Sequence, residues 1–224
     1  MLLPKAFIFD LDGVITDTAE CHFMAWRILG EALGIDFDRS FNETLKGVSR
    51  MGSLERILTY GNKADVYTNE EKVRLANEKN KAYVDLVSKI TKEDVLPNIL
   101  SLLQSLRNKN IKIGLASASE NAFEVIDRLG IRHYFDYIAD ATKIPNSKPA
   151  PDVFLDVMHG FGFESTECIG IEDAQAGIEA IKAANMFAVG IGKKSELIGA
   201  DIIFENTEKM TFDLVVNQWL KGQN

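Results

Sequence analysis

Residues 5–18 read "KAFIFDLDGVITDT", a short apolar run followed by three acidic residues. The apolar run at 6–9 has the composition of a buried strand, yet it leads directly into Asp10 and Asp12, with Asp17 close behind. Side chains two apart on a strand point the same way, so both of the first two carboxylates should project from the strand's carboxyl end. Negative charges clustered at the end of a buried strand are unfavourable on their own. They are explained if a cation and an anionic ligand bind there.

After residue 95, short apolar runs alternate with amphipathic segments. Continuous apolar runs between helices are typical of a buried parallel sheet, and the alternation predicts an α/β fold. We therefore expect a Rossmann-like, doubly wound parallel sheet that binds ligands beyond the carboxyl ends of its strands. The further strands are expected at 111–117, 137–140, 168–173, 187–192 and 201–204, and the helices at 98–109, 121–129, 151–161, 175–185 and 211–220.

Residues 18–93 break this alternation, because the interval contains no convincing strand. Residues 18–34 have helical periodicity, and residues 69–87 read as a long helix of charged and apolar residues. The simplest account is a helical cap domain at 18–93, inserted into an α/β core made of 1–17 and 94–224. In the first cap helix we expect one shared apolar face, formed by Phe23, Trp26, Ile28, Leu29 and Leu33.

Composition narrows the class of protein. The chain has 224 residues, 46% of them hydrophobic, which is enough for one sizeable core with a smaller satellite. A net charge of −8 argues against nucleic acid or an anionic membrane as the main partner. The two cysteines, Cys21 and Cys168, form no disulfide framework, and the first residues lack the pattern of a signal peptide. We expect a cytoplasmic protein, and a monomer, because a cap must be free to move.

A second acidic pair supports a metal site. Glu172 and Asp173 end the strand expected at 168–173, so four carboxylates from two strand ends should converge on one crevice. Oxygen ligands of this kind suit Mg²⁺ better than zinc. The alternative is that Asp10 and Asp12 merely initiate a turn with Gly13, since Asp-Gly is common turn chemistry.

Hydroxyl and cationic groups follow two other strands. Ser117 and Ser119 lie two apart in "LASAS", with Asn121 next, and Lys148 stands in "SKPAPD" before a helix start. Each has an ordinary interpretation, because a serine pair often caps the next helix and a loop lysine is often solvated. Their position at the carboxyl edge of the sheet favours a binding role instead.

These motifs, in this order, resemble the haloacid dehalogenase-like phosphotransferase superfamily. They are "DLDGVITDT", the serine of "ASAS", the lysine of "SKPAPD" and "IEDAQAG", and they cover nearly the whole chain. Within that superfamily, "DLDGVITDTAECHFMAW", "LKGVSR" and "ASASEN" are similar to the β-phosphoglucomutase family. Members of that family interconvert β-D-glucose 1-phosphate and glucose 6-phosphate.

The resemblance implies catalytic roles. Asp10 would be the nucleophile that carries a phosphoryl group, and Asp12 the general acid and base for a sugar hydroxyl. Ser117 and Lys148 would bind the transferring phosphoryl oxygens. Mg²⁺ would be held by Asp10, the backbone carbonyl of Asp12, Glu172 and Asp173. Glucose 1,6-bisphosphate would be the intermediate and activator.

In the cap, Thr18, His22 and Trp26 are spaced by four and so share one helix face. The resemblance implies that Thr18 and His22 orient or gate Asp12, and that Arg50 clamps a second, non-transferring phosphate. Without it, Trp26 would be read as core and Lys79 as a solvated charge. The substrate-binding set that it implies is Trp26, Gly47, Val48, Ser49, Arg50, Ser53, Lys79, Ala118, Ser119 and Asn121.

One residue departs from the family pattern. A basic or polar residue is expected after "ASAS", but this chain has Glu120, so either Glu120 points away from the phosphate or the affinity of the site differs. Two other functions stay open at this level. One is a Mg²⁺-dependent sugar-phosphate or phosphoglycolate-type phosphatase with the same four motifs, and the other is a non-catalytic phosphosugar sensor on the same scaffold.

Overall fold

A six-stranded parallel sheet forms the centre of the computed structural model, which describes residues 3–222. Its order is β3-β2-β1-β4-β5-β6, and every neighbouring pair is parallel. The order reverses beside β1, which lies between β2 and β4, and ligands bind at such a point in doubly wound sheets. The predicted α/β class is confirmed. The strands are β1 (Ala6–Phe9), β2 (Lys112–Leu115), β3 (Tyr137–Ile138), β4 (Cys168–Glu172), β5 (Phe187–Ile191) and β6 (Ile202–Phe204).

Helices cover both faces of the sheet. Side chains of β1 alternate between the faces, so that Phe7 and Phe9 join one hydrophobic cluster while Ala6 and Ile8 join the other. The first cluster contains residues of α5 (Ile99–Asn108), α6 (Ala122–Arg128) and α9 (Phe212–Gly222). The second contains residues of α7 (Asp152–Phe161) and α8 (Gln175–Ala183). The β1 strand is therefore buried on both sides, which explains its continuous apolar sequence.

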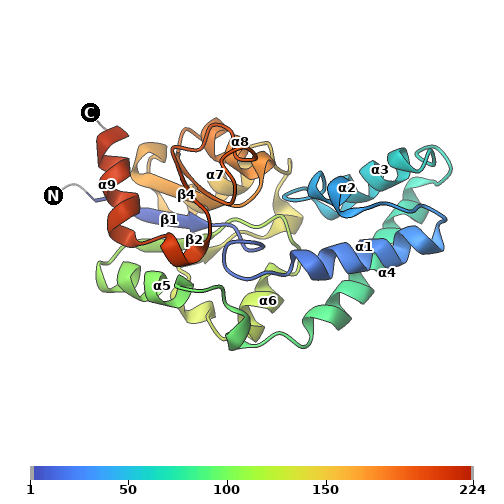
Figure 1. Ribbon diagram of the computed structural model, residues 1–224, viewed down its shortest axis with the longest axis horizontal. Coiled ribbons are helices and arrows are strands. Elements are labelled where there is room, and N and C mark those ends of the chain that lie inside the picture. The colour runs from blue at the N-terminus through green and yellow to red at the C-terminus, as the bar shows by residue number, and fades with distance from the viewer. Residues whose placement is uncertain (1–2, 223–224) are drawn as a thin grey trace.

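A second group of helices, residues 19–87, lies beyond the carboxyl edge of the sheet, to the right in Figure 1. We call it the helical unit. Trp26 and Leu29 of its first helix pack with Ile57 in a separate hydrophobic cluster, whereas Ile28 is 51% exposed, so its predicted place on the buried face is wrong. The helices are α1 (Ala19–Ala32), α2 (Arg39–Glu43), α3 (Arg50–Tyr60) and α4 (Asn69–Val87).

The chain leaves the core and returns to it at one place. Thr16 and Val95 form an antiparallel bridge, and the Thr16 hydroxyl donates to the carbonyl of Asp94 at 2.7 Å. The Leu96 amide donates to the carbonyl of Ile15 at 2.9 Å. The two connections to the helical unit are thus held side by side.

The expected elements agree closely with the observed ones. The helix expected at 69–87 coincides with α4, and the strand expected at 187–192 is β5. Short 3₁₀ helices lie at Lys92–Asp94, Arg132–Tyr134, Ala141–Lys143, Ser165–Glu167 and Thr207–Lys209. Within residues 3–222, no helix is long and apolar enough to cross a membrane.

Candidate active site

Three carboxylates meet where the sheet order reverses. The Asp10 amide donates to the carbonyl of Ile171 at 2.9 Å, which extends the β1–β4 ladder by one residue and sets Asp10 beside the end of β4. Glu172 and Asp173 stand at that end. Carboxylate oxygens of Asp10, Glu172 and Asp173 lie within 4.8 Å of one another.

Lys148 lies behind these acids, in the loop before α7. Its ammonium is fully buried and contacts Asp10 Oδ1 and Glu172 Oε1, each at 2.6 Å. Although burial opposes protonation, the two carboxylates raise the pKa of Lys148 above its ordinary value. Burial raises the pKa of Asp10 to about 6, against the lowering effect of the Lys148 charge. Asp10 is therefore ionised at neutral pH and anchored by a cation.

Two glycines leave room for the acids. The Glu172 carboxylate accepts hydrogen bonds at 2.8 Å from the amides of Asp173 and Ala174, at the start of α8. A Cβ at Gly177 would lie 1.9 Å from the Glu172 carboxyl carbon. Gly13, with φ +74°, approaches so closely that a Cβ there would lie 2.2 Å from Asp173 Oδ2. Glycine is required at both positions if the two carboxylates are to keep their places.

This acidic cluster fits Mg²⁺. Burial, and then the charges of Glu172 and Asp10, raise the pKa of Asp173 well above its usual value. Lys148 offsets only part of the repulsion among the two buried carboxylates and the half-buried Asp173, and a divalent cation would offset more. A set of carboxylate oxygens is also the donor type that Mg²⁺ prefers.

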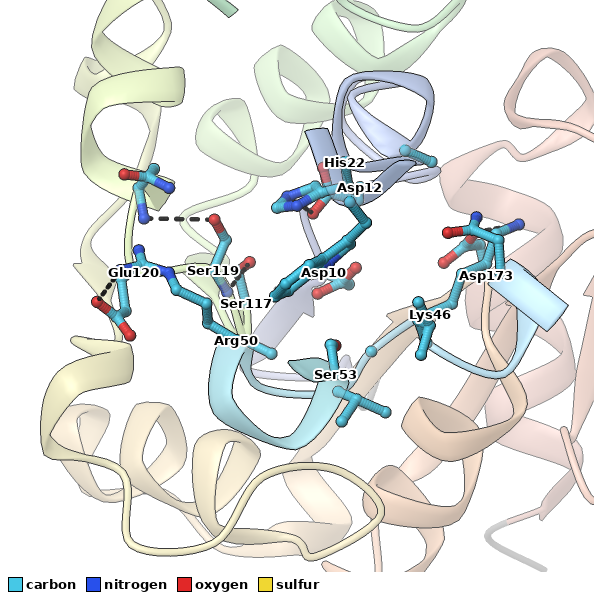
Figure 2. A pocket seen from close by; sticks show the side chains of 18 of the residues that line it. Asp10, Asp12, His22, Lys46, Arg50, Ser53, Ser117, Ser119, Glu120 and Asp173 are labelled. Atoms are coloured by element: carbon cyan, nitrogen blue, oxygen red, sulfur yellow. Dashed lines mark hydrogen bonds and ion pairs between the residues drawn. The ribbon is translucent and has the colours of Figure 1, made fainter. Parts of the chain in front are cut away.

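A cavity of about 770 Å³, counting the part open to solvent, lies between the acids and the helical unit. Figure 2 shows Arg50 and Glu120 at one end of this cavity, Lys46 and Asp173 at the other, and Asp10 between them. Most of the sequence-predicted site residues line it: Asp10, Asp12, His22, Trp26, Gly47, Val48, Arg50, Ser53, Lys79, Ser117, Ala118, Ser119, Asn121 and Asp173.

Asp12 lines the same cavity as Asp10 and Asp173 but stands apart from the three closely grouped carboxylates. Within the described chain, its carboxylate is not among the acidic oxygens that lie within 4.8 Å of one another. Burial, and then the charge of Asp10, raise the pKa of Asp12 to about 8. Among residues 3–222, Asp12 Oδ1 has no hydrogen-bond partner, which leaves it free for a ligand.

His22 connects Asp12 with a buried lysine. Lys79 Nζ lies 2.8 Å from His22 Nδ1, and His22 Nε2 lies 3.8 Å from Asp12 Oδ2. Burial, and then the charges of Lys79 and Arg50, lower the pKa of His22 well below its ordinary value, so the ring is neutral. When Lys79 is protonated its ammonium can only donate, so this contact then places the ring proton on Nε2, facing the carboxylate of Asp12.

Lys79 is not solvated. It is 3% exposed, and its ammonium lies 4.6 Å from the ring centroid of Trp26 and 4.8 Å from that of Tyr83. Burial, and then the charge of Arg50, lower its pKa to about 7. Trp26 therefore holds this lysine as well as lining the cavity.

The serines after β2 form a chain of turns at the cavity floor. Ser117 Oγ accepts from the Ser119 amide at 3.1 Å, and Ser119 Oγ accepts from the Asn121 amide at 3.3 Å. Each hydroxyl hydrogen remains able to donate to a ligand. The Asn121 side chain donates to Asn80 of α4 at 2.8 Å, which links this loop to the helical unit.

Arg50 pairs with the residue that departs from the family pattern. Ser49 caps α3 by accepting from the Gly52 amide, and Arg50 follows as the first helical residue. Its Nη1 lies 3.1 Å from Glu120 Oε2. The Glu120 carboxylate therefore faces the guanidinium at the cavity wall.

Some predicted residues lie outside the cavity lining. Thr18 is fully buried at the start of α1, Glu172 and Lys148 lie behind Asp10, and Ser49 serves as a helix cap. Sequence reasoning missed Lys46, whose ammonium lies 3.8 Å from Asp173 Oδ2, although it stands in the quoted "LKGVSR". It also missed the other lining residues Ala19, Asn42 and Leu45, which carry no distinctive pattern.

Comparisons with known proteins agree with this geometry. A family model described as a haloacid dehalogenase-like hydrolase matches residues 4–185. The chain is 50% identical to the β-phosphoglucomutase of Bacillus subtilis over 96% of its own length and 95% of that protein's. It is 33% identical to a fructose-1-phosphate phosphatase of Escherichia coli, over 82% of this chain and 94% of the other.

A solved structure resembles the whole chain. The crystal structure of β-phosphoglucomutase from Clostridium difficile superimposes with a TM-score of 0.97, at 52% identity, and covers 99% of both chains. The residues that the family model matches include strands β1 to β4 and the helical unit. The chain therefore belongs to the haloacid dehalogenase-like hydrolase family and is a homologue of the β-phosphoglucomutases.

Proposed function

We propose that the chain is a β-phosphoglucomutase, which interconverts β-D-glucose 1-phosphate and glucose 6-phosphate. The observation that carries this proposal is the single cavity with Asp10 on the sheet side and Arg50 on the wall formed by the helical unit. Such a cavity can hold the two phosphates of glucose 1,6-bisphosphate at once. The 50% identity to a β-phosphoglucomutase supports the same conclusion.

Asp10 is the proposed nucleophile. It is ionised at neutral pH, so it needs no activating base to attack phosphorus and form an aspartyl-phosphate. Lys148 holds one of its oxygens at 2.6 Å and so fixes the carboxylate against the cavity wall. Bound by Asp10, Glu172 and Asp173, Mg²⁺ would supply charge neutralisation during phosphoryl transfer. Ser117 is placed to donate to the transferring group.

Asp12 is the proposed general acid and base. With its pKa raised to about 8 it carries a proton at neutral pH, and it can give this proton to the leaving oxygen or take one from a sugar hydroxyl in the next step. Its unpartnered Oδ1 is the atom available for that exchange. The neutral ring of His22 faces the other oxygen at 3.8 Å and adds no competing charge.

The end of the cavity that contains Arg50 is the proposed site of the non-transferring phosphate. Arg50 and Lys79 supply positive charge, and Ser119 and Asn121 supply donors. We propose that residues 18–93 act as a cap that closes over the sugar. Closure would exclude water, whose attack on the aspartyl-phosphate would convert the enzyme into a phosphatase.

A coupled assay tests the proposal. Wild-type protein is incubated with β-glucose 1-phosphate, Mg²⁺ and trace glucose 1,6-bisphosphate, and both glucose 6-phosphate and free phosphate are measured. We expect glucose 6-phosphate as the main product, with α-glucose 1-phosphate as a poor substrate. Release of glucose and free phosphate in its place would establish a phosphatase, the activity that the Escherichia coli relative's description names.

A further inference from the structure

An ion pair at the cavity wall joins the helical unit to the sheet edge. Arg50 opens α3, while Glu120 lies in the loop between β2 and α6. Their side chains meet at 3.1 Å, with Arg50 13% exposed and Glu120 38% exposed. Both side chains line the cavity, so a ligand that reaches Arg50 also meets Glu120.

The charges at this end of the cavity nearly cancel. Arg50 carries one positive charge, and Lys79, with a pKa of about 7, is half protonated at neutral pH. Glu120 contributes a negative charge directly against the guanidinium. A phosphate monoester is close to doubly charged at neutral pH. It therefore approaches an arginine that is already paired with an internal anion.

We propose that Glu120 sets the affinity of this subsite by competing with the non-transferring phosphate for the Arg50 guanidinium. The inference rests on the proposed function, which places that phosphate at Arg50. Without phosphate, Glu120 holds the guanidinium. When phosphate binds, the carboxylate is displaced or remains as a repelling neighbour. Glu120 therefore lowers the affinity of this subsite.

A mutase benefits from such a competitor. Its bisphosphate intermediate must turn round, so Arg50 has to release one phosphate before it receives the other. A partly buried guanidinium that is left without a partner is costly, and Glu120 supplies the partner at the moment of release. Glu120 thus lowers the affinity of the Arg50 subsite for phosphate and makes the exchange of the two phosphates faster.

Glu120→Gln tests the competition because it keeps the shape of the side chain and removes its charge. Binding of glucose 6-phosphate is measured by calorimetry in an Asp10→Asn background, where no aspartyl-phosphate forms. We expect the dissociation constant to fall about five- to tenfold, since the anion that competes with phosphate for the Arg50 guanidinium is removed. With Asp10 intact, KM should fall and kcat should fall with it.

Glu124→Gln is the matched control. Glu124 is also 38% exposed and also pairs with an arginine, Arg128, but it does not line the cavity. Its replacement changes the net charge equally, and the dissociation constant should stay within twofold of the parent value. A third measurement repeats Glu120→Gln in an Arg50→Gln background, where the gain in affinity should largely disappear because no guanidinium remains to compete for.

Three results would overturn the proposal: an unchanged dissociation constant in Glu120→Gln, an equal fall in Glu124→Gln, or an undiminished gain without Arg50. The binding experiment is independent of the reaction product. If the wild type releases free phosphate, the proposed function fails while the binding result still decides the role of Glu120. If the wild type is a mutase and binding does not change, only this inference fails.

Discussion

Lys148→Met removes the buried cation between two acids, and its effect on stability can be worked out from the contacts. The ammonium is fully buried and lies 2.6 Å from both Asp10 and Glu172, which are 8% and 0% exposed. Methionine fills a similar volume but leaves both carboxylates uncompensated. Breaking a buried pair in this way costs about 3–5 kcal/mol of unfolding free energy. For a chain of this length, the melting temperature should fall by about 10 °C.

The loss of unfolding free energy in Lys148→Met should depend on pH. Burial raises the pKa of Asp10 to about 6 even with Lys148 present, so the folded state binds a proton that the unfolded state has released. The stability contributed by this group is fully present below its unfolded pKa and is lost as the pH rises through the folded value. Without Lys148 the pKa of Asp10 rises further, so the variant is destabilised least near pH 5 and most above pH 7.

Urea unfolding at pH 5, 7 and 8, followed by circular dichroism in the presence of EDTA, measures the effect. Lys193→Met is the matched control, because Lys193 is 76% exposed and forms only a surface pair with Glu196. A surface pair contributes little, so the control should unfold like the wild type. An equal loss of unfolding free energy in the two variants would refute a stabilising role for the buried contacts of Lys148 with Asp10 and Glu172. A loss in Lys148→Met that is the same at all three pH values would do so too.

Three further predictions follow from the same geometry. Asp10→Asn should lower turnover by at least about 10⁴-fold, since it removes the attacking oxygen, while calorimetry should still detect glucose 6-phosphate binding; turnover like that of the wild type would exclude this nucleophile. Affinity for glucose 6-phosphate should weaken as the pH rises through about 7, because burial and a neighbouring guanidinium lower the pKa of Lys79 to that value and the charged form is lost above it. Lys79→Met should bind glucose 6-phosphate more weakly, and its affinity should not change between pH 6.5 and 8.5. The same dependence of affinity on pH in the wild type and in this variant would contradict this role of Lys79. Gly177→Ala should lower Mg²⁺ affinity about tenfold in a calorimetric titration and stability by about 1–3 kcal/mol, because its Cβ would lie 1.9 Å from the Glu172 carboxyl carbon. Gly222→Ala, whose Cβ would make an ordinary 3.9 Å contact, is the control, and equal metal affinity in both variants would contradict the steric argument.

The sheet and its acidic edge could be predicted because local patterns determine them. The apolar run 6–9 and the run that forms β4 each end in carboxylates, and parallel strands bring such ends to one edge. Glu172 and Asp173 needed only this rule to be placed beside Asp10. The order of motifs along the chain then identified the family.

The residues that could not be predicted depend on distant contacts. The direction of Glu120 is set by Arg50 at the start of α3, and no local pattern relates the two. The separation of the Asp12 carboxylate from the three grouped acids likewise depends on the path of the chain beyond the end of β1. Ile28 was misplaced for a geometric reason: it lies two residues from Trp26, roughly 200° round the helix, and therefore faces solvent.

The paired connections at Thr16 and Val95 bear on how such chains can be rebuilt. Antiparallel segments held by a bridge can be joined by a two-residue hairpin. Residues 17–94 could therefore be excised and replaced by a short turn, or exchanged for a lid from another homologue, with no change in the register of the sheet. The proposed nucleophile, Asp10, belongs to the part that would remain, so recombination at this seam should change which molecules are admitted while leaving the phosphorus chemistry to the scaffold.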